Sequence, residues 1–169
     1  MNTEYRCVTC VEDIREYLAG HTIVAFDIET APNPPFRNEE KAALDPAKAH
    51  IVGCSFSIAP YTGIYVPISH LAGTNINPAD FFSFFREFLT DRTITKVAHN
   101  IAFEASFAYA LGIVIQTPVY DTICAAQMTL KTPTEFRKLA DSGLKHLADA
   151  LFHEPLPTFS SVTDGHHFD

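Results

Sequence analysis

Two carboxylates close the first strongly apolar segment of the chain. In HTIVAFDIET, residues 21–30, a run of apolar residues predicts a buried strand. Side chains alternate along a strand, so Asp27 and Glu29 share one face while Ile28 points to the other. Adjacent carboxylates resist ionising together unless a cation lies between them. The pair is therefore a candidate site for a hard divalent metal, and a strand that merely turns polar at the surface is the alternative.

The composition indicates one globular domain. The chain has 169 residues, of which 47% are hydrophobic, enough for one buried core and too few for two. No apolar run approaches membrane-spanning length, and the N-terminal residues lack the pattern of a secretory signal. We therefore expect no membrane partner and a cytoplasmic location, where cysteines stay reduced. Cys7 and Cys10 form a lone CxxC, which is a weak zinc or redox signal and is interpreted as two partly buried residues.

The net charge of −8 excludes a free-standing protein that coats duplex DNA, because such proteins neutralise phosphates with basic residues. An acidic chain does fit a nuclease in which bound cations meet the phosphate. Lys131, Arg137 and Lys138 form the one basic cluster, which is interpreted as a solvated helix face. The terminal His166, His167 and Asp169 could bind a metal, but a solvated chain end is the favoured interpretation.

The remaining pattern alternates strands and helices. Strands are expected at 5–8, 51–59, 64–68, 94–98 and within 114–120, and helices at 11–18, 78–89, 101–111, 122–130 and 143–152. The strands up to 68 follow one another closely and predict an antiparallel meander, whereas strand 94–98 follows a helix and is expected to be parallel to its neighbour. The phenylalanine-rich helix 78–89 is interpreted as core. N-caps are predicted at Thr9, Asn77, Asn100 and Asp121.

A third acid, Glu104, lies in the first turn of the helix that Asn100 begins. In α/β sheets, helix N-termini at strand ends are where ligands usually bind. Glu104 therefore lies where a ligand of such a sheet could bind.

These motifs resemble those of the ribonuclease H-like exonucleases. AFDIET (25–30) resembles the first exonuclease motif, Asp-x-Glu on a strand, and AHNIAFE (98–104) resembles the second. Four further stretches resemble the proofreading 3′–5′ exonuclease domain of family A, polymerase I-like, DNA polymerases: ALDPAKAHIVGCSFSI, IYVPISH, YDTICAAQMTL and GLKHLADALF. The resemblance implies an α/β fold, with a ribonuclease H-like mixed five-stranded sheet flanked by helices.

The resemblance also implies a mechanism. Two Mg²⁺ or Mn²⁺ ions would serve hydrolysis of the 3′-terminal phosphodiester of single-stranded DNA. Asp27 would bridge the ions, Glu29 would help to hold the one that activates water, and Glu104 would hold the other. Asn100 and Phe103 are the expected substrate contacts. The expected partners are the 3′ end of single-stranded DNA and a polymerase domain of the same parent chain.

The chain departs from the family pattern at two points. Glu104 stands where the second motif usually has Asp, and the third motif, Tyr-x-x-x-Asp, has no match: Asp164 and Asp169 lie in that region without a tyrosine. We expect a domain over residues 1–155 and a loose tail over 156–169, cut before the third motif. Three alternatives stay open: a catalytically incomplete module that binds nucleic acid or supports a polymerase, an exonuclease that trims RNA, and a zinc hydrolase using the CxxC and the terminal histidines.

Overall fold

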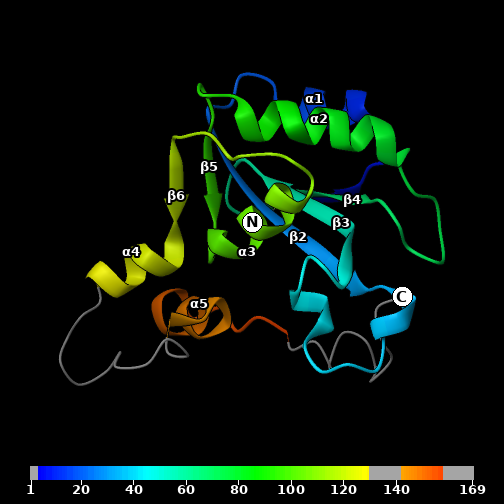
Figure 1. Ribbon diagram of the computed structural model, residues 1–169. Coiled ribbons are helices and arrows are strands. Elements are labelled where there is room, and N and C mark those ends of the chain that lie inside the picture. Colours follow the sequence, from blue (N-terminus) through cyan, green and yellow to red (C-terminus); the bar gives the residue numbers. More distant parts are fainter. Residues whose placement is uncertain (1–3, 130–141, 158–169) are drawn as a thin grey trace. The chain divides into compact units, whose positions relative to one another are not determined.

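A mixed sheet forms the centre of the fold in the computed structural model, which describes residues 4–129 and 142–157 (Figure 1). The sheet has six strands, in the order β1 (Glu4–Cys7), β4 (Thr62–Pro67), β3 (Ala49–Ser57), β2 (Ile23–Pro32), β5 (Thr95–Ala98) and β6 (Val119–Asp121). The α/β class and the mixed sheet are confirmed. The predicted number of five strands is wrong, because the short N-terminal strand pairs with β4 and extends the sheet at its edge.

The strand directions follow the sequence predictions. β3 is antiparallel to both β2 and β4, which confirms the meander. β5 is parallel to β2, and β1 is parallel to β4. β2 therefore lies between an antiparallel neighbour and a parallel one. The strand that carries the two acids is thus interior to the sheet and held on both sides.

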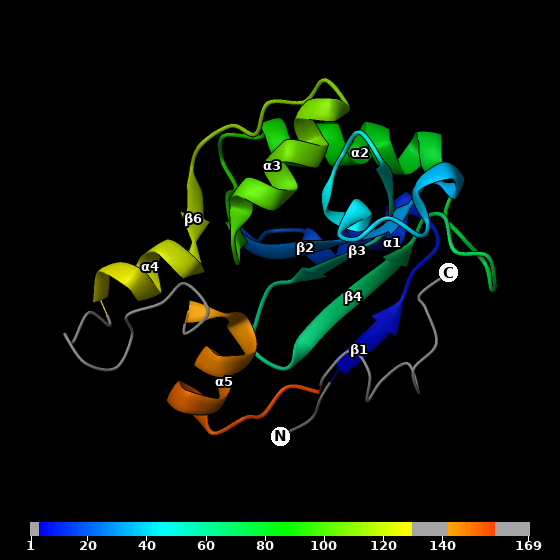
Figure 2. The same ribbon diagram turned by 60° about the horizontal axis from the view of Figure 1, so that its bottom comes forward.

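Three helices belong to the same part of the chain: α1 (Val11–Leu18), α2 (Pro78–Thr90) and α3 (Ile101–Ala110) (Figure 2). Two short 3₁₀ turns, η1 (Pro34–Phe36) and η2 (Ala42–Leu44), follow β2. Asn77 caps α2 as predicted, since its Oδ1 accepts from the backbone N–H groups of Ala79 at 2.9 Å and Asp80 at 3.4 Å. The helix at 11–18 is confirmed, but the predicted cap at Thr9 is wrong, because Cys10 is the residue directly before α1.

The phenylalanines of α2 pack against the sheet, which confirms their interpretation as core. Phe88 lies 5.4 Å from Phe26 of β2 and 5.3 Å from Phe56 of β3, between ring centroids, in edge-to-face contacts. Phe81 and Phe85 are also fully buried, and each such side chain contributes about 1.5–3 kcal/mol of burial free energy. This packing fixes which face of β2 is apolar, and it therefore leaves Asp27 and Glu29 on the other face.

Lys96 holds β5 in place from inside the protein. Its side chain is fully buried, and Nζ donates to the backbone carbonyl oxygens of Asp91 and, at 3.1 Å, Gln116. Burial lowers the pKa of the Lys96 ammonium. A buried ammonium that donates to carbonyls ties together the segments on either side of β5.

The described residues 121–129 and 142–157 belong to a second compact unit, described here by itself. It contains α4 (Thr122–Thr129) and α5 (Leu144–Phe152). The Oδ1 of Asp121 accepts from the Ile123 N–H at 3.0 Å, which confirms the predicted cap. No helix in the described part of the chain is both long and apolar enough to cross a membrane. The basic cluster, the terminal His166, His167 and Asp169, and Asp164 lie outside the described residues, and the domain boundary at residue 155 stays a prediction.

Candidate active site

β2 presents its two acids side by side on the face opposite the phenylalanine core. Asp27 pairs with Ser55 of β3, and Glu29 pairs with Gly53. Both acids keep solvent-exposed surface, while Ile28 between them is buried. The alternation expected from the sequence is therefore confirmed in the structure.

The ladder between β2 and β3 is interrupted directly after Glu29. Glu29 pairs with Gly53 but Thr30 pairs with Ile51, so Val52 is an extra residue on β3. Its carbonyl oxygen accepts instead from the backbone N–H groups of Ile68, at 2.8 Å, and Ser69, at 3.0 Å. Bulges increase local twist and re-aim neighbouring side chains, and they are common next to active sites. The sheet therefore changes direction beside the acidic pair.

α3 supplies the third carboxyl group. β5 pairs with residues 23–25 of β2 and ends at Ala98, after which the chain turns through Asn100 and enters α3. Glu104 lies in the first turn of α3 and is only 2% exposed. Glu104 lies close enough to Asp27 to lower the pKa of that carboxyl group through hydrogen bonding. Its membership of one site with the β2 acids stays a prediction.

The charges of these groups interact strongly. Burial by surrounding protein atoms raises the pKa of Asp27, while the hydrogen bond with Glu104 and the nearby His99 act in the opposite direction. Burial also raises the pKa of Glu29, and the negative charge of Asp27 raises it further. A hydrogen bond between two carboxyl groups requires that one of them carries a proton. The site therefore opposes full ionisation of its acids, and a divalent cation would offset that opposition.

The donor set suits a hard divalent metal in its chemistry. Asp27, Glu29 and Glu104 offer carboxylate oxygens, the ligands that Mg²⁺ and Mn²⁺ prefer. Within residues 4–129 and 142–157, however, no group of three or more His, Cys, Asp or Glu side chains is already arranged around a metal position. The donor chemistry of the three acids therefore suits a hard metal, although the described residues do not show a formed metal site.

The two predicted substrate residues lie at the start of α3. Asn100 occupies the N-cap position with a left-handed backbone, φ +72°, and makes no side-chain capping hydrogen bond, so its predicted capping role is wrong. The side chain of Asn100 is exposed. Phe103 is half-buried and packs on Phe107, with ring centroids 5.1 Å apart. Contact of either residue with substrate stays a prediction.

The structure adds a tyrosine to the acidic face that the motif analysis did not single out. Tyr65 of β4 pairs with Ser55, which also pairs with Asp27, so the three side chains form one row across the sheet. The Oη of Tyr65 lies 2.6 Å from Nε2 of His70. Burial, followed by the charge of Glu29, raises the pKa of Tyr65 to about 12. The alternation of Ile64, Tyr65 and Val66 in IYVPISH was the signal that could have placed this tyrosine opposite the core.

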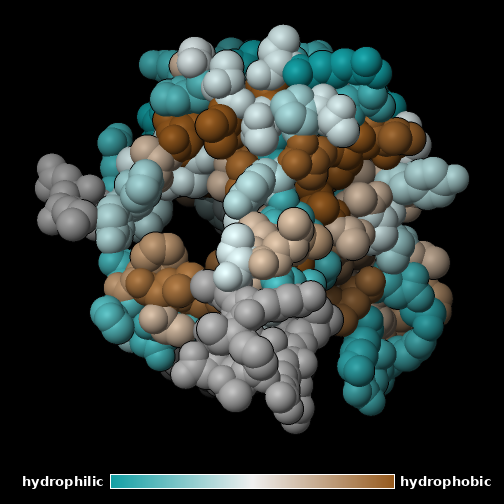
Figure 3. Space-filling model, turned by 90° about the vertical axis from the view of Figure 1, so that its left-hand side faces the viewer, coloured by the Kyte–Doolittle hydropathy of each residue, from teal (hydrophilic) through white to brown (hydrophobic). Residues whose placement is uncertain are grey.

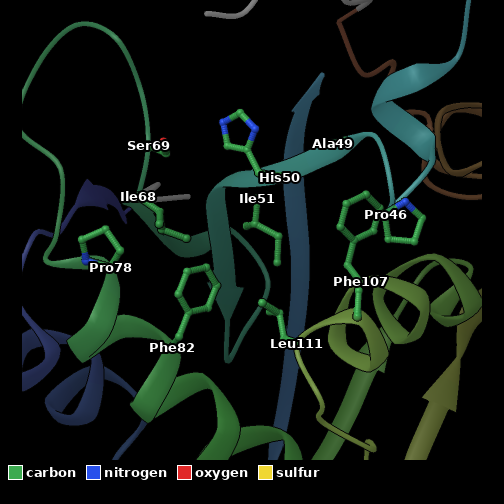
Figure 4. Close-up of a pocket in the computed structure, with 11 residues that line it drawn as sticks. Pro46, Ala49, His50, Ile51, Ile68, Ser69, Pro78, Phe82, Phe107 and Leu111 are labelled. Carbon is green, nitrogen blue, oxygen red and sulfur yellow. The ribbon is translucent and has the colours of Figure 1, made fainter. Parts of the chain in front are cut away.

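An apolar pocket of about 330 Å³ lies elsewhere in this part of the protein (Figure 4). Its lining includes Ile51, Phe82 and Leu111, and it includes none of the three acids. His50 points away from these three side chains, and its Nδ1 lies 2.9 Å from Oδ1 of Asn33. This pocket is therefore separate from the carboxylate site.

Apolar side chains also reach the surface. Figure 3 shows a face on which hydrophobic groups, in brown, lie beside hydrophilic ones, in teal. Exposed large apolar side chains of the described residues include Tyr5, Tyr109 and Val114. Unpaired bases stack on side chains of this kind.

Neither cysteine of the CxxC shows the surroundings of a zinc site. Cys7 is exposed at the end of β1, and Cys10 precedes α1. Both are free thiols. The zinc hydrolase alternative also needs the terminal histidines, which lie outside the described residues.

Comparisons with known proteins agree on the fold. NrnC of Brucella melitensis with bound Mg²⁺ is similar to the chain at 21% identity and a TM-score of 0.62, covering 99% of this chain and 70% of NrnC. Escherichia coli RNase D, an exoribonuclease involved in structured RNA processing, is similar at 17% identity and a TM-score of 0.59, covering 95% of this chain and 36% of RNase D. At these identities the likeness shows the fold, which is that of the ribonuclease H-like exonucleases.

The sequence comparisons place the chain more narrowly. DNA polymerase I of Chloroflexus aurantiacus is 28% identical over 146 residues, which cover 86% of this chain. The matched region spans 13% of that polymerase. The profile of the 3′–5′ exonuclease family matches residues 5–164, nearly the whole sequence. The chain therefore belongs to the 3′–5′ exonuclease family, of the type found in DNA polymerase I-like proteins.

Proposed function

We propose that this chain is a metal-dependent 3′–5′ exonuclease domain that removes nucleotides from the 3′ end of single-stranded DNA. The observation that carries the proposal is the position of three carboxyl groups from two elements: Glu29 lies beside Asp27 on β2, and Glu104, buried in the first turn of α3, lies close enough to Asp27 to affect its pKa. The similarity to a DNA polymerase I supports DNA as the substrate and a polymerase domain as the partner. A role in proofreading and a cytoplasmic location stay predictions.

Asp27, Glu29 and Glu104 would hold two Mg²⁺ or Mn²⁺ ions. Divalent ions at such sites activate water and neutralise charge on the scissile phosphate. The residues of the chain contribute the ligand oxygens and their orientation. β2 holds Asp27 and Glu29 on one rigid face, and the buried first turn of α3 brings Glu104 toward them. Asn100 and Phe103, at the start of α3, would contact the terminal nucleotide.

The second candidate is a catalytically incomplete module that binds a single strand or supports a polymerase. It is favoured by one observation: the described residues contain no group of three or more metal-ligating side chains already arranged around a metal position. RNA remains a possible substrate as well, since the fold is shared with RNase D.

Calorimetry with Mn²⁺ and a degradation assay on the same samples test the proposal. The substrates are single-stranded DNA and RNA of one sequence, labelled at the 5′ end, and a DNA with a phosphorothioate at the last linkage. We expect Mn²⁺ binding and stepwise shortening of the unmodified DNA, both lost in Asp27→Ala and both kept in the exposed-acid control Asp13→Ala.

The other outcomes are distinct. Mn²⁺ binding without shortening supports the incomplete module. Preferential shortening of the RNA replaces the DNA substrate by RNA. Loss of folding in Asp27→Ala, measured by thermal unfolding, would make Asp27 a structural residue and contradict the assigned site, because removing one of two crowded acids should leave stability nearly unchanged.

A further inference from the structure

Tyr65 lies on the acidic face of the sheet although it comes from a strand that β2 does not contact. Ser55 of β3 pairs with Asp27 on one side and with Tyr65 on the other. Gly53, two residues earlier on β3, pairs with Glu29. Residues two apart share a face, so Tyr65, Gly53 and the two acids all belong to one face.

Gly53 allows the tyrosine ring to lie across the sheet toward Glu29. A Cβ at Gly53 would lie 1.9 Å from the Oη of Tyr65 and 2.4 Å from its Cζ. The hydroxyl group therefore occupies the space where a side chain at residue 53 would be. Directly opposed residues of an antiparallel pair have Cα atoms about 4.5–5.5 Å apart, so this space adjoins the side chain of Glu29. The effect of the Glu29 charge on Tyr65 agrees with this proximity.

His70 holds the hydroxyl group at this position, and the loop after β4 holds His70. The Oη of Tyr65 lies 2.6 Å from Nε2 of His70. The side chain of Asn75 makes two hydrogen bonds to the backbone of His70: Oδ1 accepts from the N–H at 2.9 Å, and Nδ2 donates to the carbonyl oxygen at 2.8 Å. The start of the loop is fixed by the two backbone hydrogen bonds to the extra residue Val52. The half-buried hydroxyl group of Tyr65 is thus held by His70, whose position is fixed by Asn75 and by the start of the loop, on the face of the sheet that carries the acids.

We propose that Tyr65, held by His70, is a positioning residue of the exonuclease site, with its hydroxyl group donating to the Glu29 carboxylate while Nε2 of His70 donates to the tyrosine oxygen. This inference rests on the proposed function. A tyrosine hydroxyl has one proton and two lone pairs, so it can serve both partners at once. Groups that orient a metal-ligating carboxylate limit its rotation and strengthen metal binding.

The test removes the hydroxyl group and keeps the ring. Loss of an orienting partner of a metal ligand typically lowers metal affinity about 10- to 100-fold. We therefore expect Tyr65→Phe to raise the Kd for Mn²⁺, measured by calorimetry without substrate, by about tenfold or more. At fixed Mn²⁺ the kcat for single-stranded DNA should fall while KM is unchanged, and added Mn²⁺ should restore the rate. His70→Ala should have the same effect, and the double variant should add little.

Tyr17→Phe is the matched control. The Oη of Tyr17 lies 3.1 Å from Oγ1 of Thr62, so this variant also removes a half-buried tyrosine hydrogen bond, but one from α1. It should leave Mn²⁺ affinity and rate unchanged. Thermal unfolding of every variant shows whether it is folded, and His70→Ala replaces Tyr65→Phe as the deciding variant if the latter does not fold.

Two results overturn the inference in different ways. If the unaltered chain binds Mn²⁺ and shortens DNA, and both Tyr65→Phe and His70→Ala bind Mn²⁺ as tightly as it does, then Tyr65 has no positioning role and the proposed function stands. If the unaltered chain neither binds Mn²⁺ nor shortens DNA or RNA, the proposed function and the inference fail together.

Discussion

Replacing Gly53 by alanine should destabilise the protein, although a glycine-to-alanine change in a strand is normally stabilising. The new Cβ would lie 1.9 Å from the Oη of Tyr65, whereas ordinary van der Waals contact begins at 3.4 Å. The phenol must therefore move by at least about 1.5 Å. The phenol cannot rotate away from Gly53 and still keep its hydrogen bond to His70. Asn75 fixes the backbone of His70 through two hydrogen bonds, so His70 cannot follow the phenol.

The magnitude follows from three contributions. Overpacking of this kind costs about 1–3 kcal/mol. Loss of the hydrogen bond between Tyr65 and His70 costs about 0.5–1.5 kcal/mol. Alanine is favoured over glycine in a strand by roughly 0.5–1 kcal/mol, which offsets part of the loss. We expect a net loss of about 1–3 kcal/mol, and 2 kcal/mol corresponds to a fall in Tm of about 4–8 °C for a chain of this size.

Thermal and urea unfolding monitored by circular dichroism measure this loss. Gly63→Ala is the matched control, because a Cβ at Gly63 would meet Tyr5 at 3.2 Å, and the side chain of Tyr5 is exposed and can move. Its stability should change by less than about 1 kcal/mol. In the background of Tyr65→Ala the Gly53→Ala change should cost nothing further, since the clash is gone. An unaltered Tm in Gly53→Ala, or an equal loss in that background, would refute the placement of the hydroxyl group over Gly53.

Two further predictions concern the acidic face and the CxxC. The pKa of Asp27 is raised in the folded protein, chiefly by burial. The unfolded chain therefore loses this proton at a lower pH than the folded protein does. Stability should consequently fall as the pH rises above the ordinary carboxyl range. Asp27→Asn should reduce that fall, measured as Tm against pH in EDTA, and an unchanged pH profile would contradict the raised pKa of Asp27. Cys7→Ser should leave both Mn²⁺ binding and DNA shortening unchanged, because Cys7 is exposed; a clear loss of either would revive a role for the CxxC.

The local elements follow from short-range rules. Pro78 after Asn77 predicts the start of α2, and the structure shows the cap. The alternation in AFDIET places Asp27 and Glu29 on one face, and the motif AHNIAFE nominates Glu104. The cap of α2 and the shared face of Asp27 and Glu29 were confirmed because helix capping and strand alternation depend only on neighbouring residues, while the role of Glu104 stays a prediction.

Several features were decided by contacts between distant segments. The capping role of Asn100 was wrong because its backbone is left-handed at the turn from β5 into α3. Lys96 stands in a predicted strand as an ordinary polar residue, yet it is fully buried because carbonyl groups from both flanking segments surround its ammonium. The sixth strand joins the sheet only because β4 leaves an edge for it.

The sequence by itself determined the family and the α/β class and nominated the three acids, since each is encoded in local patterns of residue type and spacing. Only the tertiary structure decided that Glu104 lies near Asp27 and that Tyr65 lies over Gly53, the residue that pairs with Glu29. These contacts depend on the pairing of β2, β3 and β4 and on the direction in which β5 ends. Strand register relates residues that are far apart in the chain, and here it shifts at the bulge after Glu29, so these contacts follow only from the assembled sheet.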